Sequence, residues 1–182
     1  MSPPGGTFGA GGNCVPLSQP SGVLVRACAL VVNADEVCLI HRLRAEGDQY
    51  SVPGGLRHLG EGTAAALARE LQEELGLDTD RLPEPPVLRW VQDQTTTRPG
   101  TTEPFERLHL IHTLNVPDSI RSRIATTEQD ANDTTQVVWV PLAQAAALHL
   151  YPAIGSVLTA PAGTSIGPVE LPPMVDGTYK WR

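Results

Sequence analysis

Three closely spaced glutamates are the residues of this chain most able to do chemistry. Glu70, Glu73 and Glu74 lie at positions i, i+3 and i+4 of a segment whose leucines recur every four residues. This spacing predicts a helix, and at about 100° per residue it places all three carboxylates on one arc of its surface. Arg69 is the only cation within the segment. Because carboxylates at this spacing repel one another, the cluster suggests a divalent metal site, with a solvated acidic face as the alternative.

The surrounding residues indicate how this helix is placed. Glu61 stands at the expected N-terminus, where a negative charge is favourable by roughly 0.3–1 kcal/mol, Thr63 is a candidate N-cap, and Gly76 is a stop signal. Gly54 and Gly55 lie ahead of the helix, and because glycine permits close backbone approach, a carbonyl there can face the same metal as the carboxylates. The apolar stripe expected to face a core consists of Ala64, Leu67, Ala68, Leu71 and Leu75.

Taken together, these residues resemble a known family signature. Gly55 is followed after five residues by Glu61, and after seven more by residues 69–77. Over residues 55–77 this is similar, without a gap, to the complete box of the Nudix hydrolases, while residues 23–151 resemble that family only in general pattern. The resemblance implies an α/β fold, the Nudix-type α/β/α sandwich with a mixed β-sheet between helices.

The same resemblance implies an activity. It is hydrolysis of the pyrophosphate linkage of a nucleoside diphosphate linked to another moiety, with a nucleoside triphosphate or a nucleotide sugar as the open choice. Clustered carboxylate oxygens select Mg²⁺, or Mn²⁺, over Zn²⁺. The competing interpretation is a non-catalytic Nudix-fold module that senses a nucleotide or binds a protein. Loss of the box glutamates is the usual hint for such modules, and because the box here is complete, a hydrolase is favoured. An isomerase on the same fold is a third reading, for which Cys28 and Cys38 are not obviously placed.

The resemblance also assigns roles to individual residues. It implies that Glu70, Glu73 and Glu74 bind metal and that one of them takes the proton from water. Gly54 would offer its carbonyl oxygen, and Arg69 would orient a carboxylate by ion pairing.

Four acidic or ambiguous positions complete the expected site. Glu61 either joins the acidic set or forms a structural salt bridge with Arg69. In this family a loop before the last strand often supplies another acid, for which Glu128 is the first choice and Asp130 the second, against the alternative of solvated loop acids. His58 departs from the family, which often has glutamate there; it either contacts substrate or is an ordinary loop histidine.

Arginines are the candidates for substrate binding. Arg42 and Arg44 lead a predicted polar loop and are expected either to clamp a phosphate or to be solvated, and Arg57, in the loop into the helix, is a third candidate. Trp90 is a candidate to stack on a base, but a lone Trp in a strand is more often core. Gln92 stands fifteen residues beyond the box, where many ADP-ribose enzymes of the family have proline, so the sequence does not identify the substrate.

Composition limits the remaining function classes. The 182 residues fit one domain, and the net charge of −7 argues against a general nucleic-acid or anionic-membrane surface. The odd number of cysteines without metal spacing, and the absence of an apolar leader or spanning run, predict a soluble cytoplasmic protein. We expect a flexible Gly/Pro-rich arm over residues 1–21 that could reach a partner in a homodimer, a Nudix domain over 22–160, and a Pro/Gly-rich extension of uncertain order over 161–182.

The other elements are predicted only coarsely. A hairpin is expected over residues 23–41, a long polar loop over 95–104 and a helix over 142–150 opened by Pro141. His109 and His112 lie on opposite faces of one predicted strand and therefore cannot share a metal. Further strands are expected over residues 50–53, 87–94, 105–114 and 137–140.

Overall fold

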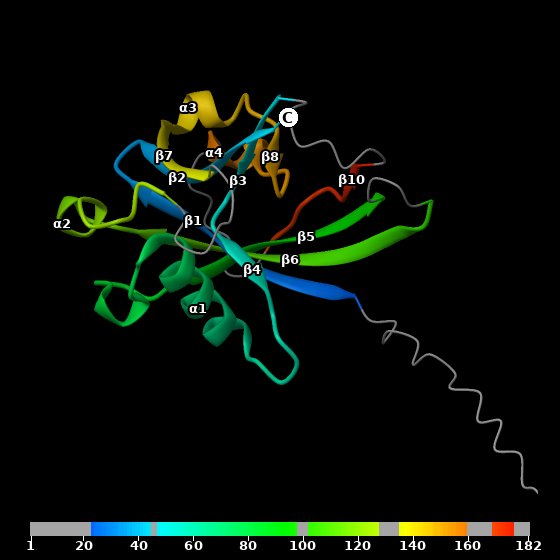
Figure 1. The fold of residues 1–182 in the computed structure, drawn as a ribbon, viewed down its shortest axis with the longest axis horizontal. Helices are drawn as coiled ribbons and strands as arrows, with labels where there is room; N and C mark the ends of the chain where they lie inside the picture. Colours follow the sequence, from blue (N-terminus) through cyan, green and yellow to red (C-terminus); the bar gives the residue numbers. More distant parts are fainter. Residues whose placement is uncertain (1–22, 45–46, 98–101, 128–134, 160–168, 177–182) are drawn as a thin grey trace, which may run out of the picture.

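The computed structural model describes residues 23–44, 47–97, 102–127, 135–159 and 169–176. These residues form a mixed β-sheet with helices on both sides (Figure 1). The strands are β1 Leu24–Asn33, β2 Glu36–Arg44, β3 Gly47–Ser51, β4 Gly54–Leu56, β5 Val87–Thr97, β6 Pro104–Asn115, β7 Thr135–Pro141, β8 Leu150–Tyr151, β9 Val169–Glu170 and β10 Met174–Asp176. The helices are α1 Thr63–Leu75, the 3-10 turn η1 Thr79–Arg81, α2 Asp118–Arg121, α3 Leu142–Ala145 and α4 Gly155–Leu158.

Strand β1 is the centre of the sheet. The main path runs β10-β5-β6-β1-β2-β3-β8, and β4, β7 and β9 pair with β1, β2 and β5. Strand β1 runs parallel to β6 and antiparallel to β2 and β4. Its residues alternate between two hydrophobic clusters, since Ala27 and Ala29 pack in one and Cys28 and Leu30 in the other. A strand buried on both faces needs cover from both sides, which the helices provide.

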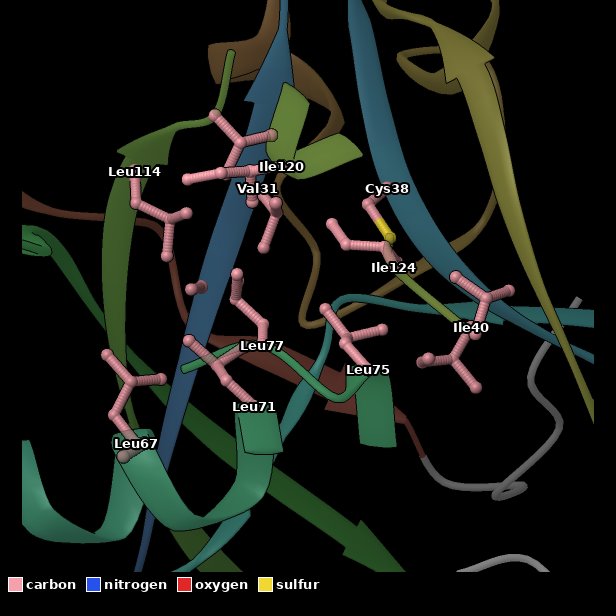
Figure 2. Packing of buried hydrophobic residues seen from close by; sticks show 14 of the residues in the cluster. Val31, Cys38, Ile40, Leu67, Leu71, Leu75, Leu77, Leu114, Ile120 and Ile124 are labelled. Atoms are coloured by element: carbon pink, nitrogen blue, oxygen red, sulfur yellow. The ribbon is translucent and has the colours of Figure 1, made fainter. Parts of the chain in front are cut away.

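Helix α1 covers one face and the short helices α3 and α4 cover the other. Figure 2 shows Leu67, Leu71 and Leu75 of α1 directed at apolar side chains of the central strands, including Val31 and Ile40. On the opposite face, buried residues of α3 and α4 pack with the strands. The predicted α/β/α sandwich with a mixed sheet is therefore confirmed.

The predicted helix is present, with changes at its start. Gly76 has φ 67° and its N–H donates to the Gln72 carbonyl, so the predicted stop is where the helix ends. The N-cap is Gly62 rather than Thr63, which is the first helical residue. Ala64 is exposed, because side chains tilt toward the helix N-terminus and a first-turn side chain therefore points past the packed turns. Ala66 replaces it in the buried stripe.

Arg42 and Arg44 do not lie in a loop as predicted. Strand β2 continues through both, because it pairs with β3 as far as Arg44 and with β7 as far as Arg42, which lies between Gln49 and Thr135. Backbone pairing with neighbouring strands thus keeps these polar residues in a strand, although their sequence neighbours alone predict a loop. Gly54 and Gly55 likewise belong to a short strand, β4.

Two other predicted segments are corrected. The loop expected over 95–104 is shorter, because β5 and β6 pair as far as Thr97 and Pro104. The helix expected over 142–150 is only α3, and Pro141 is its N-cap and the last residue of β7. The chain turns back after α3 so that β8 can pair with β3.

Part of the predicted C-terminal extension joins the sheet. Strands β9 and β10 run parallel to β5, and Leu171 and Met174 between and within them are buried. None of the helices formed by the described residues is long and apolar enough to cross a membrane. The expected N-terminal arm, residues 1–21, lies outside the described residues.

Candidate active site

The glycines of β4 allow two carboxylates of α1 to approach the backbone. The Gly54 N–H donates to Glu74 Oε2 at 2.7 Å, and Glu74 is only 5% exposed. A Cβ on Gly55 would lie 2.1 Å from the Glu70 carboxylate. A side chain at Gly55 would therefore occupy the space that the Glu70 carboxylate fills. Gly54 has φ 134°, and a Cβ there would lie 2.3 Å from the Ala27 carbonyl oxygen.

Arg69 connects the carboxylates to one another. Its Nε and Nη2 donate to the two oxygens of Glu61 at 2.9 and 3.1 Å, a bidentate pair. Its Nη1 donates to Glu70 Oε1 at 2.6 Å and to Glu73 Oε2 at 3.0 Å. Nη2 also donates to the Leu56 carbonyl at the end of β4, at 3.0 Å. One guanidinium thus offsets the repulsion among these carboxylates and ties α1 to the strand.

Glu61 is held ionised by its donors. The hydrogen bonds from Arg69, and then the one from the His58 backbone N–H, lower the pKa of Glu61 to about 2. The same pairing with Glu61 raises the pKa of Arg69 above its ordinary value. The ion pair between Glu61 and Arg69 is therefore charged at all physiological pH values. His58 contacts Glu61 through its backbone N–H rather than through its side chain.

The three box glutamates sit in different surroundings. Glu73 is exposed, with 44% of its side chain accessible, whereas only 13% of the Glu70 side chain is accessible and Glu74 is buried. Sequence spacing predicts a shared arc but does not distinguish these environments. The Gly54 N–H donates to Glu74, and the expected role of the Gly54 carbonyl oxygen at a metal stays a prediction.

The substrate-binding candidates are spread over two elements. Arg57 is exposed and its Nε donates to the Glu61 carbonyl at 3.1 Å, so it stands at the start of α1 beside the carboxylates. Arg42 donates from Nη1 to Ser51 Oγ at 3.1 Å and alternates with Cys38 and Ile40, which places it on the α1 face of β2. The Arg44 side chain lies outside what the structure describes.

Two further candidates and the metal stay predictions. Glu128 and Asp130 lie outside the described residues. Within the part of the chain that the structure describes, no three His, Cys, Asp or Glu side chains are grouped as a metal site. Carboxylate oxygens of α1 beside a glycine backbone are nevertheless the hard ligands that Mg²⁺ takes. The donor chemistry therefore fits such an ion.

Trp90 is half-buried and packs against the cluster that α3 and α4 cover, as expected for a core residue. Sequence reasoning missed a set of buried polar residues on that same face, including Gln92, Gln94 and His109. The available signal was alternation, since Gln92 and Gln94 of β5 have the period of a strand face. His109 and His112 do lie on opposite faces, since each is two residues from a member of a different cluster, Ile111 and Leu114.

Comparison with known proteins agrees with this geometry. The family model described as NUDIX domain matches residues 23–160. Similar solved structures include a Mutator MutT protein from Bacillus halodurans, 15% identical over 88% of this chain and 94% of that one, with a TM-score of 0.63. A mutT/nudix family protein from Listeria innocua is 20% identical over 74% and 88%, with a TM-score of 0.54. A MutT protein from Methanosarcina mazei is 18% identical over 78% and 94%, with a TM-score of 0.53. These likenesses show the fold, and a comparison with curated proteins gave no significant match.

Proposed function

Because the chain belongs to the NUDIX domain family, it is a Nudix-type pyrophosphohydrolase, and we propose that its substrate is a nucleoside diphosphate linked to another moiety. The bond cleaved is the pyrophosphate linkage, in a nucleoside triphosphate or a nucleotide sugar. One observation carries the proposal: the carboxylates of Glu70 and Glu74 are held against the glycine backbone of β4. Such close packing fixes oxygen ligands in one place, which a reaction at a diphosphate requires.

We propose Mg²⁺, with Mn²⁺ as the alternative, as the ion at Glu70, Glu73 and Glu74, with Gly54 and Glu128 contributing. When bound, a divalent ion neutralises diphosphate charge and lowers the pKa of a coordinated water.

The residues of the chain have separable tasks in this proposal. Arg69 orients Glu70 and Glu73 through its Nη1 donors. One of the box carboxylates accepts the proton of the attacking water, and Glu73, as the most exposed, has the freest access to solvent. Arg57 and Arg42 supply positive charge for substrate phosphates, since guanidinium groups bind phosphate through paired donors.

The proposal is tested by a nucleotide panel with Mg²⁺ in ¹⁸O-labelled water. We expect a nucleoside triphosphate to give a nucleoside monophosphate and pyrophosphate, or a nucleotide sugar to give a nucleoside monophosphate and a sugar phosphate, with one ¹⁸O in one product. Tight nucleotide binding without turnover for every member of the panel would contradict the proposal and favour the sensing module. A cytoplasmic location and a homodimer are further predictions, checked by fractionation and by light scattering.

A further inference from the structure

We propose that the cavity between α2 and β7 binds an uncharged cyclic amide, a ring that presents an N–H beside a C=O, as uracil does. The cavity is lined by residues other than the α1 carboxylates. The inference does not rest on the proposed hydrolysis, because it uses a different set of contacts.

The cavity has the size and the walls of a small-molecule site. Its volume is about 510 Å³, which is typical of pockets that hold a small ligand. Two of its lining residues, Ile124 and Val137, are buried apolar side chains, so a ring that enters meets an apolar surface. The walls also include Asp118 and Arg121 of α2, Ala125 and Thr126 of the segment after it, and Trp139 of β7.

Strand β7 has an open backbone position at Trp139. The Val137 N–H donates to the Thr126 carbonyl at 3.0 Å, so the backbone groups of Val137 point away from β2. Because these directions alternate along a strand, the N–H and C=O of Trp139 also point outward. Among the described residues neither group has a hydrogen-bond partner, because the neighbouring segment leaves the edge at Ala125, whose N–H donates to the Leu75 carbonyl at 3.0 Å.

The open N–H and C=O of Trp139 match the edge of a cyclic amide. In an antiparallel sheet, two opposite residues can exchange both of their N–H···O bonds. A small ring keeps its amide cis and therefore presents N–H and C=O on the same side, as an opposite residue would. An open-chain trans amide presents them on opposite sides. One cyclic amide can thus pair with both groups of Trp139.

The charges around the cavity favour an uncharged ligand over a phosphorylated one. Arg121 forms an ion pair with Glu36, and its Nη1 donates to Asn33 Oδ1 at 2.7 Å, so its charge is offset. The exposed Asp118 carboxylate has no cationic partner among the described residues. A carboxylate repels phosphate and accepts N–H donors, which fits a neutral amide ring.

The polar walls are held in place before a ligand enters. Asn33 Nδ2 donates to Asp118 Oδ1 and to the Val116 carbonyl, both at 2.9 Å, and Asn33 is buried. The Arg121 guanidinium lies over the Trp139 ring, 4.5 Å from its centroid. Walls fixed in this way lose little conformational freedom on binding, which favours recognition of a small ring.

The test follows the backbone amide signal of Trp139 in the full chain by NMR while δ-valerolactam, a simple cyclic amide, is added. Its N-methyl derivative is the matched probe, since it keeps the ring and the carbonyl but has no N–H. We expect δ-valerolactam to shift the Trp139 amide signal and the N-methyl derivative to bind about tenfold more weakly, because it leaves the Trp139 carbonyl without a donor. No shift at the solubility limit of δ-valerolactam, or equal affinity for the two probes, overturns the proposal.

A pair of variants tests whether the probe enters the cavity. Ala125→Leu places a larger side chain among the lining residues, and we expect it to weaken binding of δ-valerolactam by at least about tenfold. Ala143→Leu, the same change at an exposed residue of α3, should leave binding unchanged. Equal binding by both variants would contradict the site. If Ala125→Leu does not fold, the two probes decide the question in the wild type.

Uracil, uridine and UMP carry the same ring edge and identify the form of the ligand. In EDTA we expect uracil or uridine to shift the Trp139 amide signal, and UMP to bind at least about threefold more weakly than the better of the two, because Asp118 repels its phosphate. Binding of uridine would indicate a nucleoside, and binding of uracil alone a free base. UMP binding as tightly as either contradicts an uncharged ligand. Failure of hydrolysis leaves these results untouched, because EDTA is present.

Discussion

Replacing Gly55 by alanine tests whether the position of the Glu70 carboxylate matters. The new Cβ would lie 2.1 Å from that carboxylate, and ordinary contact begins at 3.4 Å. The carboxylate must therefore retreat by about 1 Å, a displacement that costs roughly 100-fold in activity when a reacting group is misplaced. Stability should change little, by about 1 kcal/mol or less, because the displaced group is the end of a flexible side chain and alanine is favoured over glycine in a strand.

The assay is the rate of Mg²⁺-dependent nucleotide hydrolysis, with urea unfolding measured in parallel. Gly62→Ala is the matched control, since a Cβ there meets nothing within 4 Å, and we expect activity within about twofold of wild type. In a Glu70→Ala background the clash is absent, so adding Gly55→Ala should cause no further loss. Wild-type activity in Gly55→Ala would refute the claim that the strand positions Glu70.

Three more predictions concern stability and reactivity. Glu61→Gln should be less stable than wild type at pH 7; since the folded pKa of Glu61 is lowered from 4.5 to about 2, the difference should persist above pH 4.5 and disappear as the pH falls toward 2, measured by urea unfolding. Burial raises the pKa of the Cys28 and Cys38 thiols to about 12, so in a Cys14→Ser variant neither should react with a thiol reagent at pH 8 until the protein is unfolded. Leu71→Ala should cost about 2–5 kcal/mol of unfolding free energy because Leu71 is fully buried, whereas Gln72→Ala on the exposed side should change it by less than about 0.5 kcal/mol.

Local sequence was sufficient where local physics decides the structure. The spacing of Glu70, Glu73 and Glu74 placed them on one helix, and Gly76 ended that helix, because periodicity and a left-handed cap are properties of neighbouring residues. Local sequence was not sufficient to place Arg42, because its polar neighbours in the sequence are typical of a loop. The strands that pair with Arg42 and keep it in a strand are β3 and β7. Its sequence neighbours carry no record of that pairing.

The candidate site shows the same division. The residue types were predictable from the box, but the buried Glu74 carboxylate accepts a hydrogen bond from Gly54, twenty residues earlier in the chain, and local sequence does not predict that contact. The buried polar residues around Arg107 were missed because their contacts are long-range. Arg107 donates a hydrogen bond to the hydroxyl of Tyr151, which belongs to β8 and lies forty-four residues further along the chain. Long-range pairing, rather than propensity, decides these features.

The most direct test of the account measures kcat/KM with Mg²⁺ for Glu70→Gln and Glu74→Gln, each checked for its fold by circular dichroism. Glu84→Gln, an exposed glutamate in the connector before β5, is the control. Since glutamine keeps the size of the side chain but removes its charge, the account predicts losses of about 100-fold or more in both site variants and none in the control. Near-wild-type hydrolysis by both site variants would contradict the assignment of the α1 carboxylates as the active site.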